Sequence, residues 1–184
     1  MVIEKKTVNT LLTPSYKPDS ESMSKINDWR DHAEKIQIDA NNTILGQEKA
    51  VKLIIICLFA RGHVLLEGGV GVGKTTLLQI ITKLIGGEYE RVEGTVDLMP
   101  NDIIYHASIN SDGKPSISNG PLLKKGEDLS IFFFNEINRA RPQVHSLLLR
   151  AMAEKSISAF NKDVYLPNMV VFADRNQVEK NETF

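Results

Sequence analysis

The chain of 184 residues is 42% hydrophobic and 24% charged, which is typical of one globular domain with a substantial core. Its formal net charge of -1 and its lack of a long Lys or Arg run argue against nucleic acid or an acidic membrane as a partner. The one cysteine, Cys57, rules out an intrachain disulfide and suits a reducing compartment. No apolar stretch follows the charged residues 1–6, and the apolar run from Leu53 to Ala60 is much shorter than the roughly 20 residues of a membrane span. We therefore expect a cytoplasmic protein without a membrane segment.

The N-terminal part of the chain is predicted to form a tail and two helices. Residues 1–21 contain Pro and Ser without sustained periodicity, which indicates a flexible tail. A helix is predicted from Ser22 to Ala40, because apolar residues recur there at helical spacing; they are Ile26, Trp29, Ala33 and Ile36. A second helix, Gln47 to Arg61, is nearly apolar over its last two turns and is expected to be buried. Gly62 is expected to end it in the left-handed conformation.

The next segment is predicted to form a strand, a glycine-rich loop and a helix. His63 to Glu67 is short and β-prone, and Thr75 to Ile85 carries apolar residues at helical spacing. A further short strand is predicted near Tyr89 to Val92. Asn110 to Gly120 is polar and contains Gly and Pro, which predicts a loop.

The last third adds two buried strands around an amphipathic helix. Ser130 to Phe134 is an uninterrupted β-prone run, as expected of an inner strand of a parallel sheet. Pro142 opens a helix with a clean apolar stripe, and Met169 to Ala173 supplies another buried strand. Because strands alternate with helices, we predict an α/β fold with a parallel sheet flanked by helices.

The glycine-rich loop matches G-x-x-x-x-G-K-[ST], the P-loop pattern, in full. The matching residues are Gly68, Gly69, Val70, Gly71, Val72, Gly73, Lys74 and Thr75. Between a strand and a helix, such a loop turns its N–H groups toward phosphate oxygens. Lys74 then reaches the β- and γ-phosphates, and the Thr75 hydroxyl is a magnesium ligand. A glycine-rich turn without a ligand is the alternative, whereas a dinucleotide fingerprint would require glycine in place of Lys74.

A second chemical motif follows the strand that ends at Phe134. Asn135 and Glu136 stand at its carboxyl end, where ligands bind in open α/β sheets. This resembles a Walker B strand, with Asn135 as a metal ligand and Glu136 as the catalytic base that polarises water. An amide is a poorer partner for Mg²⁺ than a carboxylate, so Asn135 puts metal retention and hydrolysis in question. The alternative for Glu136 is a merely solvated carboxylate.

These motifs together resemble the AAA+ ATPases, and among them the MoxR type. The first similar segments are Ile44-Leu45-Gly46-Gln47, Gly62 to Gly68 and Asp97 to Ile103. Asn135 to Ala140 matches D-E-I-N-R-A except at its first residue, and a similar helix follows. The resemblance extends from about Ile44 to Phe184. It implies a P-loop NTPase fold and adds Gln47, beside the adenine, and Thr76 to the nucleotide-binding residues.

The resemblance also assigns the segments after that helix. Ser156 to Leu166 would be the family's short hairpin, and Ala173 to Phe184 resembles the sensor-1 segment A-T-Q-N-P. Asn176 occupies the place of the sensor asparagine. It is therefore a candidate catalytic residue, in addition to Glu136 and Lys74. A loop asparagine that only satisfies backbone groups is the alternative. The other sensor positions differ: Asp174, Arg175 and Gln177 replace threonine, glutamine and proline.

By the same resemblance, the chain is an ATPase that uses ATP and Mg²⁺, yields ADP and assembles into a homo-oligomeric ring, a hexamer. The ring would remodel or activate partner proteins in a chaperone-like way, including proteins with von Willebrand factor A domains. Residues 22–184 would be an AAA+ core that is incomplete at its C-terminus, with the lid domain absent from this chain. The alternative is a hydrolysis-impaired nucleotide-binding subunit with an assembly or regulatory role. A small-molecule kinase is disfavoured because Glu136 to Ala140 follows the AAA+ pattern.

Overall fold

The computed structural model describes residues 19–69 and 71–176. Most of the predicted tail, Val70 of the P-loop and Gln177 lie outside this described part. The chain divides into two compact units, Met1–Lys35 and Ile36–Phe184.

Helix α2 (Ser20–Thr43) is longer than predicted at both ends. The Ser22 N–H donates to the Asp19 carboxylate at 2.8 Å, a cap that lets the helix begin before Ser22. In its apolar stripe, Ile26 is 53% exposed, whereas Ile36 is buried.

Helix α3 (Glu48–Phe59) ends differently from the prediction. Arg61, not Gly62, adopts the left-handed conformation, with φ 53°. The Arg61 and Gly62 N–H groups donate to the carbonyls of Leu58 and Cys57 at 2.9 and 2.7 Å, the pairing of a Schellman motif. The expected full burial of this helix is also wrong, because Leu53 and Ile56 are each 53% exposed.

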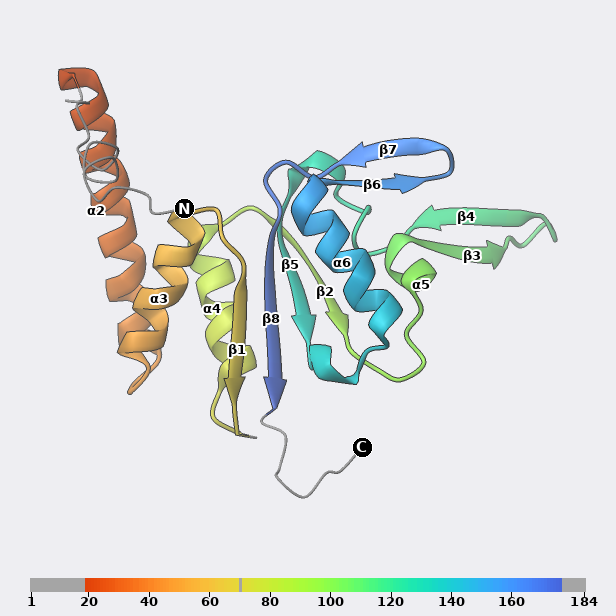
Figure 1. The fold of residues 1–184 in the computed structure, drawn as a ribbon, viewed down its shortest axis with the longest axis horizontal. Coiled ribbons are helices and arrows are strands. Elements are labelled where there is room, and N and C mark those ends of the chain that lie inside the picture. The colour runs from red at the N-terminus through yellow and green to blue at the C-terminus, as the bar shows by residue number, and fades with distance from the viewer. Residues whose placement is uncertain (1–18, 70, 177–184) are drawn as a thin grey trace, which may run out of the picture. The chain divides into compact units, whose positions relative to one another are not determined.

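The centre of the second unit is a four-stranded parallel sheet (Figure 1). Its strands, in spatial order, are β1 (Val64–Gly68), β8 (Val170–Asn176), β5 (Leu129–Asn135) and β2 (Glu88–Glu93). The first two strands along the chain, β1 and β2, thus lie at opposite edges of the sheet, whereas β5 and β8 each pair with the strand of this sheet that precedes them in sequence. The predicted parallel α/β sheet is confirmed.

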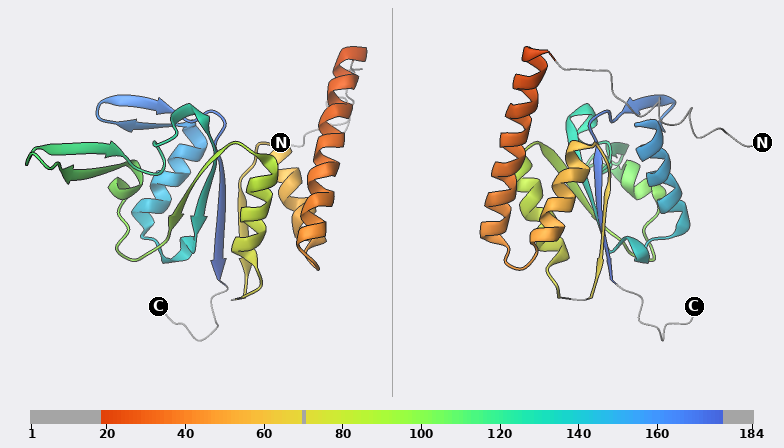
Figure 2. Two further views of the ribbon diagram at one scale, coloured as in Figure 1. Left: turned by 180° about the vertical axis from the view of Figure 1, so that it is seen from behind. Right: turned by 60° about the vertical axis from the view of Figure 1, so that its left-hand side comes forward.

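Helices cover both faces of this sheet (Figures 1 and 2). Helices α3 and α4 (Lys74–Ile85) lie on one face, and α6 (Pro142–Glu154) lies on the other. Side chains of β5 alternate between the two layers. Phe132 and Phe134 belong to the core cluster that contains Val144 and Leu148 of α6, whereas Ile131 and Phe133 point to the opposite face. All four β5 side chains are buried, which explains the uninterrupted apolar run.

Two antiparallel hairpins connect the main elements. After the short helix α5 (Pro100–Ile104), β3 (Tyr105–Ile109) pairs with β4 (Pro115–Asn119). The predicted loop Asn110 to Gly120 is therefore partly wrong: an exposed ribbon needs no apolar face, so its polar composition resembles that of a loop. The second hairpin, β6 (Ser156–Ala159) with β7 (Lys162–Tyr165), confirms the one expected by resemblance. Short 3-10 helices occupy Gly126–Asp128 (η1) and Ile137–Arg139 (η2).

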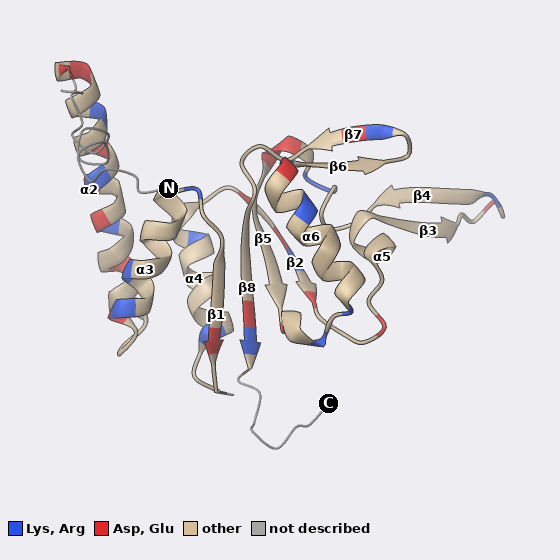
Figure 3. Cartoon of the chain, in the orientation of Figure 1, with Lys and Arg blue, Asp and Glu red and all other residues tan. Residues whose placement is uncertain are grey.

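Acidic and basic residues are interspersed over the described elements (Figure 3). Both signs occur at the carboxyl end of the sheet, where Arg175 pairs with Glu67 of the neighbouring strand. Among the described residues, no helix has the length and apolar character needed to cross a membrane.

His63, just before β1, ties the edge of the sheet to β8. The Val171 N–H donates to His63 Nδ1 at 2.9 Å, so this nitrogen must be unprotonated. Burial, and secondarily the positive charge of Lys155, lower the pKa of His63 below its usual 6.5. The unfolded chain therefore binds a proton at this residue at a higher pH than the folded chain does.

We expect the free energy of unfolding to fall as the pH drops below 6.5 toward the lowered pKa of His63. Urea titrations at a series of pH values, compared with His63→Gln, measure this. Glutamine can still accept the Val171 N–H and does not titrate, so the variant should lose part of the acid sensitivity. An identical pH dependence in both proteins would contradict the prediction, because the other three histidines are common to both.

Candidate functional site

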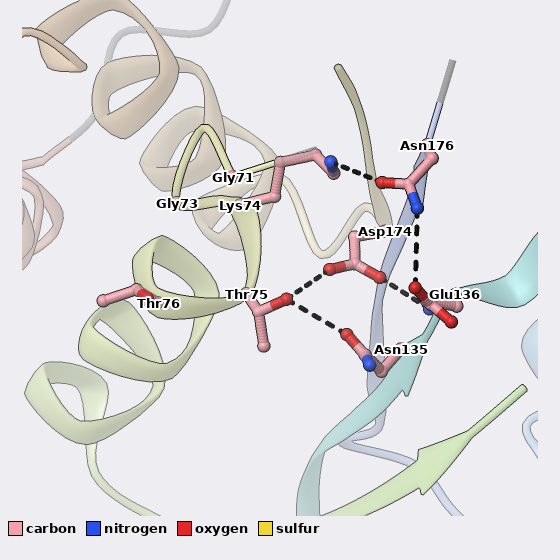
Figure 4. Close-up of a pocket in the computed structure, with 9 residues that line it drawn as sticks. All are labelled: Gly71, Gly73, Lys74, Thr75, Thr76, Asn135, Glu136, Asp174 and Asn176. Atoms are coloured by element: carbon pink, nitrogen blue, oxygen red, sulfur yellow. Dashed lines mark hydrogen bonds between the residues drawn. The ribbon is translucent and has the colours of Figure 1, made fainter. Parts of the chain in front are cut away.

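A pocket of about 350 Å³ lies at the carboxyl ends of the parallel strands (Figure 4). It is formed by the β1–α4 loop, the first turn of α4, and the ends of β5 and β8. Its lining residues are Gly71, Gly73, Lys74, Thr75, Thr76, Asn135, Glu136, Asp174 and Asn176.

Two glycines in the loop before α4 adopt a left-handed backbone conformation. Gly71 and Gly73 adopt φ values of 80° and 79°, in the region that favours glycine. Helix α4 then begins at Lys74, and its N-cap Gly73 makes no side-chain cap. The first N–H groups of the helix are consequently available to an anion, and the helix dipole favours negative charge there.

Lys74 extends back over this loop. Its Nζ donates to the carbonyl oxygens of Gly68 and Gly69 at 3.0 and 2.8 Å. A third bond, of 3.0 Å, goes to Oδ1 of Asn176 on β8. An ammonium group has three donors, so these contacts hold the charge at the mouth of the pocket.

Thr75 meets two acceptor oxygens from neighbouring strands. Its Oγ1 lies 3.1 Å from Asn135 Oδ1 and 2.7 Å from Asp174 Oδ2. A hydroxyl has one proton, so it can donate fully to only one of them. Three oxygen atoms, one of them from a carboxylate, therefore converge at the start of α4.

Glu136 stands beside these oxygens with an unusual backbone. Its φ is 51° and its ψ is 49°, a left-handed conformation that is uncommon outside glycine. Asp174 Oδ1 accepts the Glu136 N–H at 2.6 Å and holds this conformation. On the side chain, Asn176 Nδ2 donates to Oε1 at 3.4 Å, and Arg139 pairs with Oε2 at 2.9 Å.

The end of β2 supports the β5 terminus from the other side. The Gly94 N–H donates to the Asn135 carbonyl at 2.7 Å, and a Cβ at position 94 would overlap the Glu136 carbonyl oxygen. Glycine is thus required for this close approach. Glu93 Oε1 accepts from Asn135 Nδ2 at 3.0 Å, which fixes the Asn135 amide with its oxygen toward Thr75.

The structure brings most of the predicted site residues into the pocket. Gly68 and Gly69 contribute through their carbonyls to Lys74. Gln47 and Val72 do not line the pocket; they meet in a long contact of 3.4 Å from Gln47 Nε2 to the Val72 carbonyl. Val70 lies outside the described residues.

Sequence reasoning missed Asp174 and Glu93. Strand periodicity could have indicated Asp174, because residues 170, 172 and 174 of one strand share a face. Glu93 carried no such signal, because only the strand pairing shows that it lies beside Asn135.

The oxygen cluster does not amount to a complete metal site by itself. The part of the chain that the structure describes has no group of three or more His, Cys, Asp or Glu arranged to hold a metal ion. Magnesium in nucleotide sites is typically bound by one or two protein ligands together with phosphate oxygens and water. The donor set fits such an ion once phosphates supply the remaining ligands.

A P-loop between the first strand and helix of a parallel α/β sheet defines the P-loop class of nucleotide-binding proteins. Comparison with known proteins gives the family. The model of the ATPase family associated with various cellular activities (AAA) matches residues 63–184. The chain therefore belongs to this AAA family of ATPases.

The relatives confirm the resemblance to the MoxR type. The chain is 59% identical to a MoxR protein of Methylorubrum extorquens over 86% of its own length and 46% of that protein. It is 55% identical to MoxR of Paracoccus denitrificans, with 88% and 48% covered, and 32% identical to the chaperone MoxR1 of Mycobacterium tuberculosis, with 79% and 38% covered. The chain spans about half the length of the two more similar relatives.

A solved structure agrees with this assignment. A protein of Cytophaga hutchinsonii, named as a candidate ATPase, superimposes with a TM-score of 0.72 at 26% identity. The superposition covers 89% of this chain and 49% of that one. The expected P-loop NTPase fold is thus confirmed.

The Asn135 amide should be required for stability in the absence of a metal. Asn135→Asp replaces a donor to Glu93 by a carboxylate, so two carboxylates would face each other beside Asp174. We expect the free energy of unfolding in EDTA to fall by about 1–3 kcal/mol, measured by urea titration. The same substitution made with Glu93→Gln should cost much less, because the glutamine amide can donate; equal losses in both backgrounds would contradict the explanation.

Proposed function

We propose that this chain binds ATP with Mg²⁺ and hydrolyses it to ADP. The observation that supports this most directly is the convergence of Lys74, Thr75, Glu136 and Asn176 on one pocket at the start of α4. They come from three separate segments of the sequence, and each has the chemistry that phosphoryl transfer to water requires.

Nucleotide binding would depend on the loop and the first turn of α4. The backbone amides between Gly68 and Thr76 would receive the phosphates, and Lys74 would exchange its carbonyl partners for β- and γ-phosphate oxygens. Gln47, which touches the loop at Val72, would lie on the adenine side.

Magnesium would be held beside Thr75 and Asn135, where the convergent oxygens suit a hard cation. When bound, it would neutralise charge on the phosphates. Phosphate oxygens and water would complete its ligands.

Hydrolysis would depend on Glu136 as the base that accepts a proton from the attacking water. Among the described residues, its Oε1 has only the long contact with Asn176, so this oxygen can turn to a water. Asn176 touches both Lys74 and Glu136, a position from which its amide can orient that water or contact the γ-phosphate. Lys74 would stabilise the charge that develops on the transferred group.

Membership of the family supports a proposal for the activity of the whole protein. We propose that the chain from α2 onward serves as an AAA+ core, and that the assembled protein is a homo-oligomeric ring with a lid domain. Such a ring would remodel partner proteins, such as those with von Willebrand factor A domains, in the cytoplasm. Relatives named MoxR and chaperone MoxR1 support this proposal.

A second candidate function is a nucleotide-binding subunit without turnover. Two observations favour it: an amide at position 135, and the ion pair of Arg139 with Glu136 Oε2. The two candidates differ in phosphate release, not in ATP binding.

Lys74→Ala should weaken ATP binding at least about tenfold, because charge-assisted hydrogen bonds contribute about 1.5–3 kcal/mol. Isothermal titration calorimetry with ATP and Mg²⁺ measures this. Lys83→Ala, at the exposed end of the same helix, is the matched control and should bind normally. Unchanged affinity in Lys74→Ala would exclude the P-loop as the ATP receptor.

Glu136→Gln should reduce phosphate release at saturating ATP by about 10²–10⁴-fold, with ATP affinity nearly unchanged. Glu67→Gln removes another strand-end carboxylate, outside the pocket, and should retain turnover. Parallel loss of binding and turnover in Glu136→Gln would instead indicate a structural role. No phosphate release by the unaltered chain, with normal ATP binding, would favour the second candidate.

A further inference from the structure

We infer that Asp174 supplies the carboxylate that holds magnesium, in place of the carboxylate missing at Asn135. Compared with the Walker B pattern, the carboxylate for the metal would lie on β8 and not on the neighbouring strand β5. This inference rests on the proposed ATP-Mg²⁺ binding and names a residue that the P-loop and Walker B patterns do not include.

The sheet places these two side chains next to each other on one face. Phe133 pairs with Phe172, and Phe134 with Ala173. One step further along both parallel strands come Asn135 and Asp174. Because side chains alternate along a strand, they share the face opposite the Phe134 cluster, which is the α4 side. A carboxylate on either strand can therefore reach the same oxygen cluster beside Thr75.

Burial and charge single out Asp174. It is 2% exposed and is the only buried Asp, Glu, Lys, Arg or His among the described residues. No Lys or Arg of the described part forms an ion pair with it. A buried carboxylate without a counter-ion is unfavourable. A cation beside Oδ2, where the Thr75 hydroxyl now lies at 2.7 Å, would provide that counter-ion.

The other acidic side chain near the cluster is less suitable. The Glu93 side chain is 55% exposed and is paired with Arg91. It also accepts the Asn135 amide, so its charge is already compensated. Asn135 offers a single neutral oxygen, which adds a ligand without adding charge.

Asp174 has a second contact that an uncharged residue could also make. Its Oδ1 accepts the Glu136 N–H at 2.6 Å. If this contact were its only role, the amide oxygen of asparagine would serve equally well. Asp174→Asn therefore separates a metal-binding charge from backbone support.

The experiment compares ATP affinity with and without metal. Isothermal titration calorimetry with ATP in EDTA, and again with Mg²⁺, gives the gain in affinity that the metal provides. In Asp174→Asn we expect that gain to fall at least about tenfold, as weakened metal sites do, while affinity in EDTA is retained. Electron paramagnetic resonance of free Mn²⁺, with ADP present, should show the same loss. Thermal unfolding of each variant checks that it folds.

Two further variants distinguish the strands. Asn135→Ala removes the neutral ligand and should reduce the gain less than Asp174→Asn does. N135D/D174N exchanges the two side chains and should recover most of the gain. This double variant also carries Glu93→Gln, so that the new aspartate at position 135 does not face the Glu93 carboxylate. The variant with Glu93→Gln alone is its reference. A gain that is lost in Asp174→Asn but not recovered by the exchange would overturn the inference, because charge would not be the cause.

Failure of this inference differs from failure of the proposed function. If the unaltered chain binds ATP more tightly with Mg²⁺ and Asp174→Asn does so equally, Asp174 is not the metal carboxylate and the inference is wrong. If the unaltered chain binds no ATP, the proposed function is wrong, and the inference fails with it.

Discussion

The parallel pairing of β5 with β8 is the constraint on which the site depends. Because the two strands run in the same direction and in fixed register, their last residues reach the same edge of the sheet, facing the first turn of α4. The Thr75 hydroxyl contacts both strands. The loop, helix and strand ends are consequently held together by hydrogen bonds among polar side chains, above a core of aromatic residues. Such polar networks are stable only when their members are satisfied, so a bound cation and phosphates fit naturally into this one.

Local sequence was sufficient wherever the chemistry is local. The glycines of the loop, Lys74 and Thr75 are contiguous, and the apolar run of β5 is unmistakable, so the fold class and most of the pocket could be predicted. The exposed hairpin of β3 and β4 could not, because polar residues in a solvent-facing ribbon resemble a loop. The left-handed residue after α3 was predicted one position too late, at Gly62 and not at Arg61, because arginine can adopt a conformation usually reserved for glycine.

The residues that sequence reasoning missed are those whose role arises from strand order. Glu93 and Asp174 come from strands on either side of β5, and neither is near the other in the chain. Judged by the sequence motif alone, asparagine in place of aspartate at position 135 is a defect. The structure shows a carboxylate on the adjacent strand, 2.7 Å from the same threonine hydroxyl. A motif read along one strand cannot detect a substitution that a neighbouring strand compensates.

The adjacency of positions 135 and 174 also limits how such a site could have changed over time. Two substitutions separate this arrangement from one with aspartate on β5 and an uncharged residue on β8, and they would occur one after the other. If the carboxylate on one strand is gained first, the intermediate has two carboxylates, crowded by Glu93. If the carboxylate on the other strand is lost first, the intermediate has none at these two positions. The first intermediate keeps a charge for the cation throughout, whereas the second lacks it. The two positions are thus expected to vary as a pair during divergence, with an acidic residue retained on at least one strand at every step.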